Sequence, residues 1–197
     1  TYPSQEQLFQ EAETVLERHP RLHVIFAHFY FHSMRPERLE QLFVRFPSVH
    51  VDITPGAEMY RNFSPRAAFW HEFFTRWQDR ILFGTDNMAP VDPGIQAHEG
   101  MRDKVQMMRR FLETHETFEG FCTATSRWVT GIGLSEEVLR KIYAGNFERL
   151  FGAAPRPLDV EEALRHCWKV ANFARRTPGQ EDLLKEMQEI QKAFERL

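Results

Sequence analysis

Three short apolar runs, each with ionisable side chains at or near its end, constrain the fold of this chain most. They are residues 22–28 (LHVIFAH), 49–54 (VHVDIT) and 81–86 (ILFGTD). Short continuous apolar runs are typical of strands buried on both faces, as in a parallel sheet covered by helices. The third run stops on Asp86, and a carboxylate at the end of a buried strand commonly holds a metal ion, a proton or a substrate. The alternative is that Gly84 to Asn87 forms only a turn.

Helical patterns with their own start signals alternate with these runs. Ser4 and Gln7 predict a capping box, Pro36 begins a second helical pattern, and Ser64-Pro65 begins a third. We therefore predict adjacent parallel strands at 22–28, 49–54 and 80–86, in that order, with helices at about 4–18, 36–46 and 65–77. Right-handed crossovers place the carboxyl ends of such strands on one side of the sheet. His28 and Asp86 are then expected to face the same crevice.

The same segments resemble a known family. The stretches are FAH (26–28), LEQLF (39–43), FPSVHVD (46–52), DRILFGTD (79–86) and, further on, LSEEVLRKI (134–142) and NFERLFG (146–152). They are similar to the C-terminal half of the amidohydrolase-related metal-dependent hydrolases. This branch of the amidohydrolase superfamily includes aminocarboxymuconate-semialdehyde decarboxylase-like and resorcylate decarboxylase-like enzymes. The resemblance implies an α/β fold, the (β/α)8 TIM barrel, of which the chain would carry strands six to eight plus C-terminal helices.

The resemblance also implies a domain organisation. Residues 1–152 would be the C-terminal part of a metal-dependent hydrolase barrel, and residues 153–197 a helical tail that packs on the barrel or on a partner. Asp159 with Glu162 predicts one helix in this tail, and a second is expected after Pro178-Gly179. Strands one to five, with the family's His-x-His, would precede residue 1. We therefore expect a fragment, or a barrel that another polypeptide completes.

Asp86 and His28 are the expected catalytic and metal-binding residues. The resemblance implies that Asp86 binds a catalytic divalent metal and takes a proton from metal-bound water, whose pKa the metal lowers towards ~7. It implies that His28 acts beside that water or ligates a second metal; the alternative is a core histidine satisfied by the backbone. Zn²⁺ is the expected cofactor, with Mn²⁺ and Fe²⁺ as alternatives. Asp52 is expected to be a hydrogen-bonding residue rather than a ligand.

Further candidates for substrate binding follow the strands. They are Tyr30, His32, Glu58, Tyr60, Arg61 and Asn87. For the loop that carries Glu58, ordinary solvation is an equal alternative. Where relatives often have His-x-Gly-Gly, this chain has His28-Phe29-Tyr30-Phe31, which puts bulky aromatic side chains beside the metal. His28 and His32 have the HxxxH spacing, but that spacing suits a helix rather than the end of a strand, so no joint site is expected.

Composition excludes several classes of partner. No apolar run approaches the ~20 residues of a membrane span, and a net charge of −3 gives no general attraction for nucleic acid. Cys122 and Cys167 lack CxxC spacing, which favours structural thiols in a reducing compartment and hence a cytoplasmic protein. We expect a small-molecule substrate, neither a nucleic-acid nor a membrane partner, and a homo-oligomer.

Two function classes follow. The first is a metal-dependent hydrolase that acts on a small carboxylated or cyclic compound through metal-activated water, or a nonoxidative decarboxylase, a lyase of the same superfamily. The second is a noncatalytic half-barrel that serves as an assembly or regulatory subunit. Asp86 and His28 supply at most two ligands, so we expect this chain alone to bind no catalytic metal tightly and to be inactive. Its three strands would also leave two unpaired edges prone to association.

Overall fold

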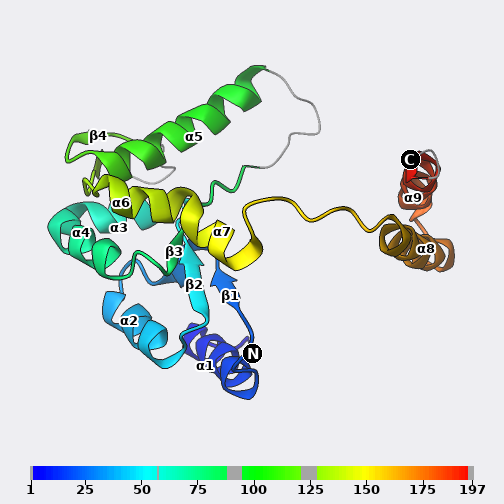
Figure 1. Cartoon of the computed structure of the whole chain (residues 1–197), viewed down its shortest axis with the longest axis horizontal. Coiled ribbons are helices and arrows are strands. Elements are labelled where there is room, and N and C mark those ends of the chain that lie inside the picture. Colours follow the sequence, from blue (N-terminus) through cyan, green and yellow to red (C-terminus); the bar gives the residue numbers. More distant parts are fainter. Residues whose placement is uncertain (1, 57, 88–94, 121–127, 195–197) are drawn as a thin grey trace. The chain divides into compact units, whose positions relative to one another are not determined.

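The computed structural model describes residues 2–56, 58–87, 95–120 and 128–194. The chain forms two compact units, Thr1–Ala153 and Ala154–Leu197, and each is described by itself (Figure 1). Cys122 lies outside the described residues, and Cys167 is a buried free thiol. No helix in the described ranges combines the length and the apolar character that crossing a membrane requires.

A three-stranded parallel sheet lies at the centre of the first unit. Its strands are β1 (Val24–Phe26), β2 (Val49–Asp52) and β3 (Ile81–Leu82), in the order β1-β2-β3. Val24 pairs with Val49, and Val51 pairs with Ile81. The predicted order and direction of the three strands are therefore confirmed. The strands are shorter than predicted because the chain leaves the extended conformation before His28 and before Asp86.

Helices and a small hairpin surround this sheet. In chain order they are α1 (Gln5–Arg18), η1 (His28–Phe31), α2 (Pro36–Arg45), α3 (Met59–Phe63), η2 (Ser64–Arg66), α4 (Ala67–Arg76), α5 (Ile95–Glu113), β4 (Thr117–Glu119) paired antiparallel with β5 (Trp128–Thr130), α6 (Glu136–Arg140), η3 (Lys141–Gly145) and α7 (Asn146–Phe151). The predicted capping box is confirmed, because Ser4 and Gln7 exchange hydrogen bonds of 2.7 and 3.3 Å. The short helix α3 falls where only a loop was expected. It forms because one turn buries Met59, Tyr60 and Phe63 together.

The core of the first unit is an aromatic cluster. Its fully buried members are Phe29 on η1, Phe63 on α3, Trp70 and Phe74 on α4, and Phe111 on α5. Phe29 stacks on Phe74 with ring centroids 5.6 Å apart and meets Phe63 edge-on at 5.1 Å. Burying one such side chain contributes about 2–3 kcal/mol. The cluster therefore fixes η1, at the end of β1, against the helices that cover the sheet.

The edge of β3 that faces away from β2 is capped by the helices after β5. The amide of Phe83 donates to the carbonyl oxygen of Ile142 at 2.9 Å, and Asn146 Nδ2 donates to the carbonyl of Ile81 at 2.8 Å. The Ile142 carbonyl lies in η3, a single π-helical turn, and such a turn leaves carbonyl oxygens free for other donors. The expectation of two unpaired edges is therefore wrong for β3. The strand β1 pairs with β2 alone among the described strands.

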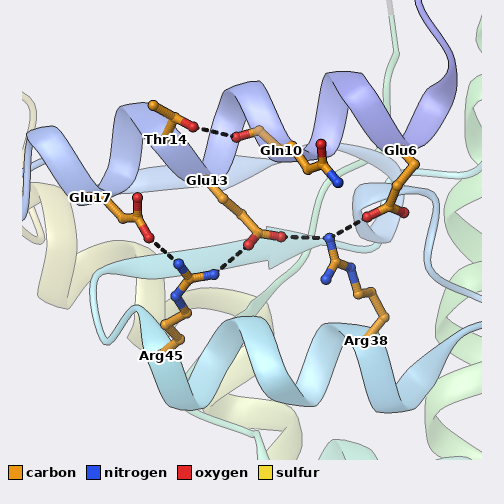
Figure 2. A network of polar contacts seen from close by, with 7 residues as sticks. All are labelled: Glu6, Gln10, Glu13, Thr14, Glu17, Arg38 and Arg45. Atoms are coloured by element: carbon orange, nitrogen blue, oxygen red, sulfur yellow. Dashed lines mark hydrogen bonds and ion pairs between the residues drawn. The ribbon is translucent and has the colours of Figure 1, made fainter.

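An ion-pair ladder joins α1 to α2. Figure 2 shows Arg38 and Arg45 of α2 reaching toward Glu6, Glu13 and Glu17 of α1. Glu13 binds both arginines, with oxygen-to-nitrogen distances of 2.8 Å to Arg38 and 2.6 Å to Arg45. Its side chain is 14% exposed, against 49% for Glu6 and 50% for Glu17. Glu13 is therefore the member whose charge is least screened by water.

We expect Glu13→Ala to lower the free energy of unfolding by about 1 kcal/mol, because it removes two partly buried ion pairs at once. Glu11→Ala is the matched control, since Glu11 is an exposed glutamate on the same helix. Urea unfolding of both variants in 0.05 M and 1 M NaCl measures the effect. The difference between them should shrink in high salt. Equal stabilities at low salt would show that the ladder contributes nothing.

The second unit is a helical hairpin. It consists of α8 (Val160–Arg176) and α9 (Glu181–Phe194), which contact each other along their length. Asp159 caps α8 by accepting from the amide of Glu162 at 2.9 Å, and Gly179 takes a φ of +79° in the turn. Both predicted tail helices are confirmed. The packing of this unit on a barrel or on a partner stays a prediction.

Candidate active site

The carboxylate of Asp52 holds the ends of the strands together. Its Oδ1 accepts from the amide of His28, just after β1, at 2.9 Å and from the amide of Thr54 at 3.0 Å. A Cβ on Gly84, just after β3, would lie 3.4 Å from the Asp52 Cβ and 2.5 Å from Thr54 Oγ1. Only glycine at position 84 therefore allows the end of β3 to approach Asp52 and Thr54 so closely. The predicted hydrogen-bonding role of Asp52 is confirmed.

His28 is half-buried, and its ring is oriented by the backbone. Its Nδ1 lies 3.2 Å from the carbonyl oxygen of Thr54. Because a carbonyl oxygen only accepts, this contact assigns the proton to Nδ1 and leaves Nε2 as the free acceptor or ligand. A histidine anchored in this way presents the nitrogen that metal ions commonly use. Nε2 of His28 is therefore free for the proton transfer or metal binding expected of this residue.

Backbone strain gathers at the ends of β1 and β3. In the described ranges, the non-glycine residues with positive φ are His28, Phe29, Tyr30 and Phe31, at +52° to +56°, and Asp86 at +50°. The element η1 is thus a left-handed turn. Each such residue costs roughly 1–2 kcal/mol relative to a right-handed one. Strain of this kind clusters at functional sites, where the surrounding structure holds it in place.

Packing and hydrogen bonds hold this left-handed turn. Phe29 is buried in the aromatic cluster, and Tyr30 stacks on Phe26 with ring centroids 3.8 Å apart. The amide of Tyr30 donates to the carbonyl of Ala27 at 2.9 Å. Phe31 is 56% exposed, and its ring centroid lies 5.7 Å from that of His28. The turn therefore presents one aromatic ring to solvent directly beside the candidate catalytic histidine.

We expect Phe31→Gly to be more stable than Phe31→Ala by about 1 kcal/mol, because glycine adopts positive φ without steric cost. The exposed helical residue Val44, in α2, provides the matched control. There the order should reverse, with Val44→Ala more stable than Val44→Gly by about 1 kcal/mol. Chemical denaturation of the four variants gives both differences. If alanine were the more stable residue at position 31 as well, the turn would not be left-handed in solution.

Asp86 lies exposed beyond the end of β3. Lys104 of α5 donates from Nζ to its carbonyl oxygen at 3.1 Å, which ties this segment to the helix. The Asp86 carboxylate makes no hydrogen bond or ion pair with any residue that the structure describes. It is therefore free to bind a cation. Sequence reasoning missed Lys104, because a single lysine on a helix carries no distinguishing signal.

Three of the other predicted site residues are at least partly accessible to solvent. Glu58 is half-buried, and both its carboxylate and the Cβ of His28 lie within 4 Å of where a Cβ on Gly56 would be. The two side chains therefore share one side of the β2–α3 connection. Arg61 is half-buried on α3, and Asn87 is exposed next to Asp86. Glu58 therefore lies near His28, whereas no contact among the described residues joins Arg61 or Asn87 to either side chain.

Tyr60 and His32 belong to the core. Tyr60 is 5% exposed and donates its hydroxyl to the carbonyl of Ile53 at 2.8 Å. Burial, followed by the nearby charge of Asp52, raises its pKa well above the ordinary value. His32 is 1% exposed, with its ring 4.7 Å from Phe9 and 5.1 Å from Tyr30. The two residues point inward because α3 and η1 both turn tightly, and we remove them from the candidate site.

Two buried histidines are expected to make the fold acid-sensitive. Burial lowers the pKa of His32 and of His50 to about 4, from an ordinary value of 6.5. Between these values the unfolded chain binds more protons than the folded chain. The free energy of unfolding is therefore highest above about pH 6.5, and it falls as the pH decreases towards 4.

From pH 7.5 to pH 5.5 the expected loss is about 1 kcal/mol per buried histidine. His32→Leu and His50→Leu should each reduce this loss, whereas His19→Leu should not, since His19 is exposed. Guanidinium unfolding at the two pH values measures it. An unchanged pH dependence in both buried variants would show that these side chains are hydrated in the folded protein.

The donors at this site are of the kinds that Zn²⁺ binds, but they are few. His28 Nε2 and the Asp86 carboxylate are an imidazole nitrogen and a carboxylate oxygen, and catalytic zinc commonly takes about three protein ligands plus water. Within the described part of the chain, no group of three or more His, Cys, Asp or Glu side chains is placed to hold a metal. His28 and Asp86 therefore supply two donors of the right kinds, which is fewer than a catalytic zinc site needs.

Comparison with known protein families finds a match. The family model described as "Amidohydrolase" matches residues 2–153, which cover most of the chain and the whole of the sheet. No curated protein and no solved structure shows a significant match.

Proposed function

The chain belongs to the amidohydrolase family, and from this premise we propose that it contributes to a metal-dependent hydrolase. The substrate would be a small carboxylated or cyclic compound, attacked by metal-activated water. The observation that carries the proposal is the strain at His28–Phe31 and at Asp86. It falls at the carboxyl ends of β1 and β3, where catalytic groups of parallel α/β enzymes are located.

Each residue has a definite task in this proposal. Members of the superfamily generally use divalent metals, and such an ion lowers the pKa of bound water to about 7. Asp86 would ligate the ion and accept the proton, since its carboxylate is unpaired among the described residues. His28 would act through Nε2, because Thr54 fixes Nδ1. Zn²⁺ suits these donors best, and Mn²⁺ and Fe²⁺ are alternatives.

We further propose that β1, β2 and β3 are strands six, seven and eight of a (β/α)8 barrel, with 153–197 as its helical tail. Their parallel order and the meeting of their carboxyl ends at Asp52 support this. A cytoplasmic homo-oligomer with a small-molecule substrate belongs to the same proposal. Pairing β3 with another strand would require Phe83 and Ile81 to give up their bonds to Ile142 and Asn146.

A nonoxidative decarboxylase is the second candidate. The exposed ring of Phe31 beside His28 favours it, because a flat apolar surface next to an acid-base group suits a cyclic or aromatic acid. In this case the protein would deliver a proton to carbon as CO₂ leaves. A noncatalytic assembly or regulatory subunit is the third candidate, and the capped edge of β3 favours it.

Metal dependence and isotope labelling separate these candidates. The complete barrel to which this chain is proposed to contribute is purified, treated with a chelator and then reloaded with Zn²⁺, Mn²⁺ or Fe²⁺. It is assayed on small lactones and aromatic carboxylic acids in ¹⁸O water, with ¹³C in the carboxyl group. A hydrolase incorporates ¹⁸O into the product, whereas a decarboxylase releases ¹³CO₂. Activity that survives metal removal, or no activity with any ion, would contradict the proposed function.

A further inference from the structure

A cavity of about 390 Å³ lies apart from the candidate active site. It is lined by Ala67, Ala68, His71, Glu72, His115 and Ile132. The first four belong to α4, His115 follows α5, and Ile132 follows β5. Alanine and isoleucine side chains form an apolar floor, and two imidazoles and a carboxylate supply metal-binding donor atoms. None of these residues takes part in the proposed hydrolytic chemistry.

His71 is oriented in the way that favours metal binding. Its Nδ1 lies 2.8 Å from the carbonyl oxygen of Ile132. Since the carbonyl only accepts, Nδ1 carries the proton, and Nε2 keeps its lone pair. Metal-binding histidines almost always donate their other ring N–H to a carboxylate, carbonyl or water in this manner. His71 therefore has a fixed tautomer and one nitrogen free for a ligand.

The imidazole ring of His115 packs against Gly133. Gly133 has a φ of +57°, and a Cβ on it would overlap the imidazole of His115. The close approach of the ring thus requires glycine at this position. The side chain is exposed, and it makes no hydrogen bond with the residues described in the structure. The Nε2 edge of the ring packs against Gly133, so Nδ1 is the ring nitrogen that is left for a ligand.

The rings of His71 and His115 are nearly close enough to bind one metal ion together. Their ring centroids are 6.3 Å apart, with an angle of 36° between the ring planes. Two imidazoles on one ion, at a metal–nitrogen distance of about 2.1 Å, would bring the centroids to about 5 Å. A modest rotation of the exposed His115 closes this difference. Glu72 lines the same cavity.

We propose that His71 and His115 bind one divalent transition-metal ion, with water completing its coordination. Imidazole nitrogen suits Cu²⁺, Ni²⁺ and Zn²⁺, and Cu²⁺ binds most tightly to a given set of such ligands. No group of three metal-binding side chains is found among the described residues. The proposed site therefore consists of two imidazoles, and it is complete only when the ion and its water ligands are bound. It would join α4 to the α5–β4 connection and stabilise the first unit.

Titration of the full chain with Cu²⁺ and with Zn²⁺, followed by calorimetry, tests this site. His71→Ala and His115→Ala should each weaken binding by about tenfold or more. His23→Ala is the matched control, because His23 is exposed and distant in sequence, and it should bind like the wild type. Asp86→Ala should also keep this binding, which separates the site from the proposed catalytic centre.

Electron paramagnetic resonance of the Cu²⁺ complex supplies a readout independent of stability. Hyperfine structure from two imidazole nitrogens is expected in the wild type, and from one in His115→Ala. This variant should fold, since its side chain is exposed. Wild-type affinity in both His71→Ala and His115→Ala, equal weakening in His23→Ala, or a spectrum without imidazole nitrogen would each overturn the proposal.

Discussion

Asp86→Ala is expected to lower kcat/KM by about 10³-fold or more in the active enzyme and to weaken metal retention. The reason is that a metal ligand contributes several kcal/mol to stabilising the transition state. Asp86 is exposed and its carboxylate is unpaired among the described residues, so its removal should leave the free energy of unfolding almost unchanged. Steady-state kinetics, elemental analysis and urea unfolding give the three quantities.

Asp103→Ala provides the matched control for this experiment. Asp103 is an exposed aspartate on α5, and its replacement should alter neither metal content nor rate. Undiminished metal and activity in Asp86→Ala would refute the assignment of Asp86. Loss of activity together with a large loss of stability would refute it as well, because the residue would then be structural.

Asp52→Ala is expected to lower the free energy of unfolding by about 3 kcal/mol. The change leaves the amides of His28 and Thr54 without an acceptor, and each unsatisfied buried donor costs about 1–3 kcal/mol. It also releases the start of the left-handed turn. Asp52→Asn keeps an acceptor oxygen at the same place, so its expected cost is about 1 kcal/mol.

Guanidinium unfolding of the two Asp52 variants measures the difference. Because Asp52 is a hydrogen-bonding residue in this account, Asp52→Asn should retain bound metal. A wild-type free energy of unfolding in Asp52→Ala would mean that the carboxylate does not join the strand ends. Complete loss of metal from Asp52→Asn, with stability unchanged, would make Asp52 a ligand instead.

Local signals were sufficient to predict the sheet and most helices. The runs that contain Val24 and Ile81 are continuously apolar, which indicates buried parallel strands, whereas in the run that contains Val49 the apolar side chains alternate with polar ones. The capping residues Ser4 and Asp159 satisfy the first helical amides by themselves, so their helices begin where predicted. Signals of this kind depend on neighbours in the sequence and are therefore visible without the structure.

The left-handed turn at 28–31 could not be predicted. Bulky side chains disfavour positive φ, so the local preference of Phe29, Tyr30 and Phe31 points away from the conformation they adopt. Tertiary contacts override it: Phe29 packs in the aromatic cluster, and Asp52, more than twenty residues along the chain, accepts from the amide of His28. The capping of β3 by η3 and Asn146 depends in the same way on distant segments.

Only part of the candidate site could be predicted from the sequence. The rule that functional groups lie at the carboxyl ends of parallel strands selects His28 and Asp86 from sequence alone. It does not tell which way a side chain points after the strand has ended. Tyr60 and His32 turned inward because α3 and η1 wind tightly, and neither element had been predicted. Lys104 and the carbonyl of Thr54 have no sequence signal at all.

Anomalous diffraction at the metal absorption edge, from crystals of the metal-loaded complete barrel, shows directly where the catalytic ion binds. An ion is expected at the carboxyl ends of β1 and β3, with an Asp86 oxygen at about 2.0–2.2 Å and His28 facing it through Nε2. An ion bound only between His71 and His115, or an Asp86 carboxylate that points away from a bound ion, would contradict it.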